Sequence, residues 1–240
     1  MLIKTKKSPN FSKKVRKTKD IKFLIIHYTG MQSRIESINR LIDPKSKVSC
    51  HYLIDRKGKI LKMVNEDRVA WHAGKSKWKN FVNLNKYSIG IELVNKGHAF
   101  GYEKFNKLQI GNLIKLCIQL KKKYKIKNSN ILGHSDIAPL RKQDPGEKFP
   151  WQKLNKNDLG IWCENSIIKK KKTYKKNKKN IFFRNLYEIG YRYFNKNKRL
   201  KKDVTIVKAF QRRFLPNKIT GIIDQKTFII SHFLANLRKI

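Results

Sequence analysis

Three short apolar runs constrain the fold of this chain more than any other feature. They are IKFLIIHY at 21–28, SIGIELVN at 88–95 and NSNILGH at 128–134. The first two are rich in β-branched residues, and all three are as short as ordinary strands. Runs of this kind are typical of buried β-strands. We therefore predict strands at these three places.

Helical periodicity separates the predicted strands. Apolar residues recur at helical spacing from 35 to 42, where Asp43-Pro44 closes the segment, and again along one face of a longer helix at about 103–125. Residues 50–64 read as two strands around a turn at Lys57-Gly58. This interleaving favours a mixed α/β fold, with a central sheet and flanking helices.

A lysine-rich stretch and a change of pattern divide the chain. Lysines crowd residues 164–180 and repel one another, which predicts an extended linker. Three short helices are predicted beyond it, at 181–194, 204–214 and 226–237, with Asp203 and Asp224 as N-caps of the second and third. The predicted layout is a basic arm at 1–20, a first domain at 21–160, a linker at 161–180 and a three-helix domain at 181–240.

The formal charge of +42 normally suggests a polyanionic partner. However, 46 of the 58 basic residues are Lys and 12 are Arg, whereas base reading favours Arg. Compositional drift towards A/T-rich codons explains the excess of lysine equally well, so we expect no specific nucleic acid as partner.

No apolar run is long enough for a transmembrane helix, and the N-terminal residues lack a signal-peptide h-region, so we expect a cytoplasmic protein.

Three side chains from separate segments are the ligands that a catalytic zinc site needs. His27 closes one predicted strand, His134 follows another, and Asp144 lies in the loop GHSDIAPLRKQDPG at 133–146. Three protein ligands leave one position open for water or substrate, and zinc can bring the pKa of its water to about 7. Each histidine alone is as well explained by a structural role, so the set needs support from its neighbours.

Two further charged residues fit hydrolysis at such a site. Glu92 is flanked by apolar residues within its predicted strand, and burial raises the pKa of a carboxylate, which suits a general base. Lys142 stands two residues before Asp144, so a loop can aim both at one point, where an ammonium stabilises an oxyanion. The alternative to a catalytic role is, for Glu92, an ion pair with one of the many lysines and, for Lys142, an ordinary solvent-exposed side chain.

In this order, FLIIHYTG, HYLIDRKGKI, WHAG, IGIELVN and GHSDIAPLRKQDPG resemble the zinc-dependent N-acetylmuramoyl-L-alanine amidases, a family that includes peptidoglycan recognition proteins. The resemblance spans about 21–154. It implies a central mixed sheet, Zn²⁺ as cofactor, ligands at His27, His134 and Asp144, and Glu92 and Lys142 as the catalytic pair. Phage relatives have Cys as third ligand, so Asp144 places the chain with the bacterial enzymes.

The same resemblance implies residues that contact substrate. The predicted substrate-binding residues are Tyr52, Trp71, His72, Asn95 and Arg141. Trp71 and Trp78 offer aromatic faces to sugar or peptide, although ordinary packing explains each as well. We assign no catalytic part to His98 or His232, and we place His51 at most near the groove.

Residues VKAFQRRFLPNKITGIIDQKTF near the C-terminus resemble a small three-helix peptidoglycan-binding domain. The alternative is a helical bundle that only stabilises the enzyme.

Together these features predict a monomeric amidase that cleaves the bond between N-acetylmuramic acid, or its 1,6-anhydro form, and L-alanine. A non-catalytic peptidoglycan receptor is the alternative function. The missing h-region favours imported anhydromuropeptides as substrate, whereas a wall-binding domain favours an exported enzyme, in the periplasm or cell envelope, acting on intact peptidoglycan.

Overall fold

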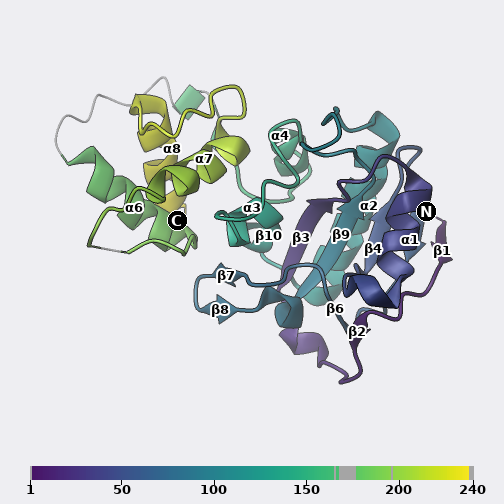
Figure 1. The fold of residues 1–240 in the computed structure, drawn as a ribbon. Helices are drawn as coiled ribbons and strands as arrows, with labels where there is room; N and C mark the ends of the chain where they lie inside the picture. Colours follow the sequence, from purple (N-terminus) through teal and green to yellow (C-terminus); the bar gives the residue numbers. More distant parts are fainter. Residues whose placement is uncertain (1, 165, 168–176, 196, 238–240) are drawn as a thin grey trace.

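The structure is a computed structural model, which describes residues 2–164, 166–167, 177–195 and 197–237. A six-stranded sheet forms its centre, with helices packed around it (Figure 1). The strands in spatial order are β1 (Ile3–Thr5), β5 (Ile60–Lys62), β4 (Tyr52–Ile54), β9 (Ser88–Leu93), β3 (Phe23–Tyr28) and β10 (Ile131–Gly133). Only β4 and β5 pair in antiparallel fashion, so the sheet is mixed, as predicted.

Helices and two small sheets complete the described chain. The α-helices are α1 (Arg34–Ile42), α2 (Lys107–Tyr124), α3 (His134–Ile137), α4 (Trp151–Asn155), α6 (Lys178–Ile189), α7 (Asp203–Phe214) and α8 (Gln225–Asn236). Short 3-10 helices are η1 (Thr18–Asp20), η2 (Pro44–Ser46), η3 (Leu84–Tyr87) and η4 (Asn128–Asn130). The small sheets pair β2 (Phe11–Ser12) with β6 (Val69–Ala70) and β7 (Lys77–Trp78) with β8 (Phe81–Val82).

The predicted elements are present, with shifted ends. Helix α2 begins at Lys107 rather than near residue 103. The carboxylate of Asp224 accepts the backbone N–H of Thr227 and caps α8, as predicted. The cap prediction for Asp203 is wrong. Asp203 is the first residue of α7, and its carboxylate turns back to accept the N–H of Leu200 at 3.0 Å.

Residues 2–20 are tied to the sheet rather than extending as an arm. Strand β1 adds to the sheet edge beside β5, and β2 pairs with β6. The Arg16 guanidinium is buried and donates to the carbonyl oxygens of Glu66 at 2.9 Å and Ser88 at 2.7 Å. Buried guanidinium donors need such acceptors, and these bonds fix the segment on the domain.

Strand β3 separates two apolar cores because alternate side chains of a strand face opposite sides. Leu24 and Ile26 pack with residues of α2. Phe23 and Ile25 face the other side and pack with residues of the C-terminal helices. His27 follows in the second series, so the twofold alternation directs it to the side on which the C-terminal helices lie (Figure 1).

Helices α6, α7 and α8 share their core with the sheet. One continuous buried cluster contains Phe23 and Trp78 from the sheet-bearing part and Phe182, Phe210 and Phe228 from the three helices. A separately folded domain on a linker would bury its apolar residues within itself. Of the predicted linker at 161–180, the lysine-rich residues 168–176 lie outside the described residues.

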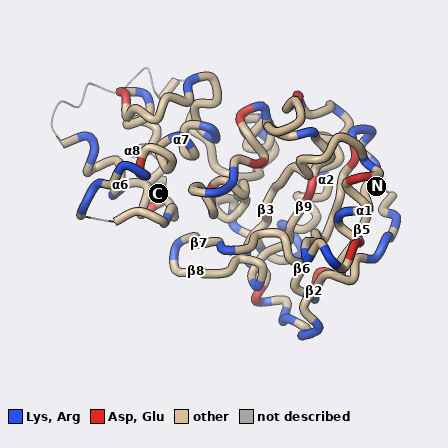
Figure 2. The backbone as a smooth tube through the Cα atoms, viewed as in Figure 1, with Lys and Arg blue, Asp and Glu red and all other residues tan. Residues whose placement is uncertain are grey.

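Basic residues are spread over both halves of the molecule rather than gathered on one face in this view, as Figure 2 shows. Across the described residues, no helix combines the length and the apolar character needed to cross a membrane.

Glu66 joins the chain beyond β5 to helix α2. Its carboxylate accepts hydrogen bonds from the Tyr52 and Tyr124 hydroxyls and from the Lys123 ammonium, the last at 2.6 Å. Burial alone would raise the pKa of Glu66, but these donors outweigh it and lower the pKa to about 2. A pKa below the unfolded value stabilises the fold above pH 4.5, and that contribution disappears as pH falls towards 2.

We predict that Glu66→Gln lowers the free energy of unfolding by about 2 kcal/mol at pH 7, because hydrogen bonds to a charged carboxylate are lost. The deficit should shrink to less than half at pH 3, where the unfolded chain has gained the proton. Denaturant unfolding at both pH values measures this, with Glu188→Gln, at an exposed position of α6, as control. An equal deficit at pH 7 and pH 3 would contradict the assignment.

Candidate metal centre and active site

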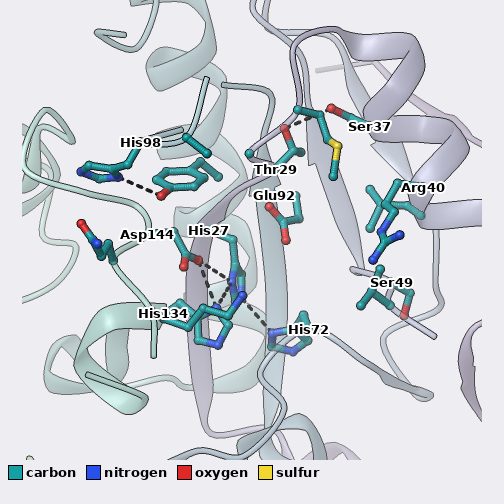
Figure 3. Close-up of a pocket in the computed structure, with 18 of the residues that line it drawn as sticks. His27, Thr29, Ser37, Arg40, Ser49, His72, Glu92, His98, His134 and Asp144 are labelled. Atoms are coloured by element: carbon teal, nitrogen blue, oxygen red, sulfur yellow. Dashed lines mark hydrogen bonds and ion pairs between the residues drawn. The ribbon is translucent and has the colours of Figure 1, made fainter. Parts of the chain in front are cut away.

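Two neighbouring strands bring His27 and Glu92 together. In the parallel pairing of β3 and β9, His27 stands opposite Glu92. Paired residues of adjacent strands project from the same face of a sheet, so both side chains enter the same space. Figure 3 shows them side by side in a pocket.

His134 and Asp144 complete a triangle with His27. His134 is the first residue of α3, directly after β10, and the chain returns to it at Asp144, whose carbonyl oxygen accepts the Ser135 N–H at 2.8 Å. The Nδ1 atoms of the two histidines are 3.0 Å apart, and Asp144 Oδ2 lies 3.0 Å from His27 Nδ1 and 3.1 Å from His134 Nδ1. All three side chains are buried.

A chain of hydrogen bonds determines which nitrogen of His27 carries its proton. The Ser88 hydroxyl donates to the Leu84 carbonyl oxygen at 2.6 Å, so it accepts from His72 Nε2 at 3.1 Å. His72 Nδ1 is then an acceptor, and it receives the Nε2–H of His27 at 2.9 Å. Burial, reinforced by the charge of His134, lowers the pKa of His27 to about 4. A neutral His27 holds one ring proton, so its Nδ1 presents a lone pair to the triangle.

The second ring nitrogen of His134 also faces a hydrogen-bond acceptor. Its Nε2 lies 3.1 Å from the carbonyl oxygen of Ala73, which only accepts, and 3.3 Å from the Arg141 guanidinium. The neutral tautomer that donates Nε2–H to Ala73 presents the Nδ1 lone pair to the triangle. Histidine ligands of metals usually donate their second nitrogen to a carbonyl or a similar acceptor in this way.

The triangle fits a bound cation better than a hydrogen-bonded cluster. When both imidazoles are neutral and carry their proton on Nε2, two nitrogen lone pairs and a carboxylate oxygen about 3 Å apart repel one another unless a positive ion lies among them. Tetrahedral zinc with bonds of about 2.0–2.1 Å places its ligand atoms roughly 3.3 Å apart, close to the distances here. Among the described residues, these three form the group of histidine, cysteine and acidic side chains close enough to share a metal ion.

Glu92 is a carboxylate in a poor environment for charge. It is partly buried, and its Oε2 atom is shielded from solvent without a hydrogen-bond partner among the described residues. Burial raises the pKa of Glu92 to about 8, with a further contribution from the charge of Asp144 and an opposing one from Lys142. A carboxyl group with a pKa near neutrality exchanges protons readily at physiological pH, as a general base must.

The pocket around these residues is an open cavity of about 440 Å³. His27, His134, Asp144 and Glu92 line it and lie close to one another (Figure 3). Lys142, predicted beside Asp144, lines the same pocket. The structure therefore brings all five predicted metal and catalytic residues to one cavity.

The predicted substrate-binding residues divide into two groups. Trp71, His72 and Arg141 line the pocket. His72 is mostly buried and bonded to His27, while the Arg141 guanidinium donates to the carbonyl oxygens of Ala73 and Lys75, the latter at 2.9 Å. These contacts tie Arg141 to the segment that receives the His134 proton.

Tyr52 and Asn95 do not line the pocket, contrary to prediction. The hydroxyl of Tyr52 is directed to Glu66 within the core, and Asn95 Nδ2 donates to the Glu103 carbonyl oxygen at 2.9 Å. Trp78, offered as a sugar-contacting face, is only 1% exposed because Tyr191 packs on its ring with centroids 4.9 Å apart. Burial of these side chains leaves them no face for a ligand.

Other residues of the site escaped the sequence analysis. His98, to which no part was assigned, lines the pocket, and its Nδ1 receives the Tyr28 hydroxyl at 2.8 Å. Arg40 of α1 reaches the opposite wall (Figure 3). Ser88 acts through His72, 16 residues earlier in the chain. Nothing in the local pattern around these residues distinguishes them from ordinary surface or strand positions.

Sequence comparison matches residues 17–147 to the N-acetylmuramoyl-L-alanine amidase family model. The amidase AmiD of Escherichia coli is 34% identical over 232 residues, covering 89% of this chain and 82% of AmiD. The 1,6-anhydro-N-acetylmuramyl-L-alanine amidase AmpD of Haemophilus influenzae is 34% identical over 164 residues, covering 61% of this chain and 86% of AmpD.

Solved structures of amidases resemble this chain as the sequence comparison does. AmiD of E. coli, in complex with the substrate anhydro-N-acetylmuramic acid-L-Ala-D-γ-Glu-L-Lys, superposes with a TM-score of 0.80 at 32% identity, covering 95% of this chain and 92% of that one. AmpDh3 of Pseudomonas aeruginosa, in complex with anhydromuramic pentapeptide, gives 0.79 at 27% identity, covering 93% and 94%. The chain belongs to the N-acetylmuramoyl-L-alanine amidase family.

Proposed function

We propose that this protein is a zinc amidase that hydrolyses the bond between N-acetylmuramic acid and L-alanine, with zinc held by His27, His134 and Asp144. The convergence of two imidazole Nδ1 atoms and one carboxylate oxygen at 3.0–3.1 Å carries the metal assignment. The ligand set of two imidazoles and one carboxylate suits zinc. Zinc in a three-ligand site supplies Lewis-acid chemistry, which polarises a carbonyl and acidifies water.

Glu92 is the proposed general base. Its raised pKa lets it take the proton of the attacking water and then pass it to the nitrogen of the leaving L-alanine. A cation at the three-ligand site favours the ionised carboxylate, so metal binding should bring the pKa of Glu92 down from the value near 8. The base would then be charged at neutral pH when the site is loaded.

Lys142 is the proposed stabiliser of the oxyanion. It lines the same pocket, two residues from Asp144, so its ammonium is available to the carbonyl oxygen that gains negative charge during attack. His72 and Ser88 hold His27 in the tautomer that offers Nδ1, and the Ala73 carbonyl does the same for His134. These residues prepare the ligand set rather than act on substrate.

The relatives support a soluble muropeptide as the substrate. The AmiD and AmpDh3 complexes contain anhydromuramyl peptides, and the name of AmpD specifies the 1,6-anhydro form. We extend this to the present chain as an enzyme that accepts anhydromuropeptides. We also propose that helices α6–α8 bind peptidoglycan, on the motif resemblance at 207–228. Assays on intact sacculi beside anhydromuramyl-tripeptide test both points.

We predict that Asp144→Ala loses zinc affinity by roughly 100-fold or more, because two imidazoles alone leave the ion short of a charged ligand. Elemental analysis of metal-stripped and reloaded protein should give one zinc per wild-type chain and almost none in the variant. The exposed Asp67→Ala serves as the matched control and should keep its zinc. Full zinc content in Asp144→Ala would refute the ligand assignment.

We predict that Glu92→Gln lowers kcat by roughly 100-fold, because the amide has no basic site for the water proton. Zinc content and binding of the muropeptide should persist, since Glu92 is not among the three ligands. Release of L-alanine peptides, measured by chromatography, follows turnover, and Glu188→Gln is the control. Undiminished cleavage by Glu92→Gln would rule out the base, whereas a wild type that binds but never cleaves would favour the receptor alternative.

A further inference from the structure

Asp136 lies at the junction between the metal-site loop and the C-terminal helices. It is two residues after His134 on α3, and it is fully buried. Its Oδ2 accepts the backbone N–H of Gly133 at 2.8 Å, which caps α3. Its Oδ1 accepts the hydroxyl of Tyr191, beyond α6, at 2.6 Å. One carboxylate therefore joins the start of α3 to a distant part of the chain.

Arg213 of α7 forms the second link. Its Nη1 donates to Asp136 Oδ2, and its Nη2 donates to the Ile131 carbonyl oxygen at 3.1 Å, at the start of β10. The guanidinium carbon lies 4.1 Å from the ring centre of Trp151, so α4 covers its face. Arg213 is 2% exposed, which makes this a buried ion pair.

Such a pair contributes little to net stability compared with a well-packed apolar substitute, because desolvation of both charges offsets their attraction. Its main effect is to fix the relative orientation of the two segments that it joins, since the guanidinium and carboxylate tolerate few relative orientations. Both of its backbone anchors, Ile131 and Gly133, belong to β10, the strand that leads directly into His134.

The position of α3 determines where two of the three proposed ligands, His134 and Asp144, lie. His134 is its first residue, and the N–H of Ser135 donates to the Asp144 carbonyl oxygen at 2.8 Å. A shift of α3 therefore displaces His134 directly and Asp144 through this bond. Metal geometry depends on distances held within about 0.2 Å, so small shifts matter.

A further contact holds the C-terminal helices in place at this junction. The backbone N–H of Lys79 donates to the Gly190 carbonyl oxygen at 2.8 Å. Gly190 packs so closely on Trp78 that an added Cβ would lie 2.4 Å from its ring. Tyr191 follows directly and covers the same ring. The segment that carries Tyr191 is thus closely packed against Trp78.

We propose that Arg213 and Tyr191 are positioning residues of the metal site, which hold α3 through Asp136 and so complete the site from the C-terminal helices. These helices then serve the active site itself, whatever else they bind. The predicted effect on zinc binding rests on the proposed function. Its structural part, the tethering of α3, stands independently of the metal.

Arg213→Met tests the proposal in the full-length protein, because it removes the charge and keeps an unbranched side chain. Zinc affinity is measured by chelator competition. Hydrogen exchange of the Gly133 and Ser135 amides in the metal-free protein is followed beside that of α2. Tyr191→Phe, which removes one hydroxyl, is the second variant should Arg213→Met fail to fold. Arg213→Lys tests rescue by a charged side chain, and the exposed Arg184→Met is the matched control.

We expect Arg213→Met to bind zinc about 10-fold more weakly, with kcat reduced and KM little changed, and with faster exchange at Gly133 and Ser135 but not in α2. Tyr191→Phe should change the same quantities by less, Arg213→Lys should recover part of the loss, and Arg184→Met should match wild type. Unchanged zinc affinity and unchanged exchange in Arg213→Met would overturn the proposal. A wild type that binds no zinc would instead refute the proposed function, while the exchange measurement would still decide the tethering.

Discussion

The close approach of two imidazole nitrogens and one carboxylate oxygen is the constraint on which the rest of the site depends. His27, His134 and Asp144 bring two nitrogen lone pairs and a carboxylate oxygen to within 3.0–3.1 Å of one another inside the protein. Such an arrangement is unfavourable unless a cation relieves it, so the surrounding chain must hold it in place. Strand pairing fixes His27, hydrogen bonds fix the ring protons, and α3 fixes the other two ligands.

Much of this was predictable from the sequence because strands and ligands have local signatures. The apolar runs at 21–28 and 88–95 identify two strands, and the twofold alternation within them places His27 and Glu92 on definite faces. The structure adds that the two strands are neighbours. The family motifs then connect Asp144 and Lys142 to the same site, and one pocket contains all of them. Trp78 shows the limit of that reasoning, because an aromatic residue near a motif looks the same whether a ligand or Tyr191 covers it.

Contacts between distant segments could not be predicted in this way. The bond from His72 to Ser88 and the bonds from Asp136 to Tyr191 and Arg213 join residues 16 to 77 positions apart, with no periodicity to reveal them. The shared core of the sheet and the C-terminal helices is a further case. A lysine-rich linker predicts independent domains, because local charge repulsion says nothing about the apolar faces that meet beyond it.

The most direct test of the account is a crystal structure of the zinc-loaded protein with anomalous data collected on both sides of the zinc absorption edge. The account predicts one anomalous peak about 2.0–2.2 Å from His27 Nδ1, His134 Nδ1 and an Asp144 carboxylate oxygen, with Glu92 outside the coordination sphere. A peak coordinated through the Nε2 atoms, a peak at another cluster, or no peak with zinc present in excess would contradict it.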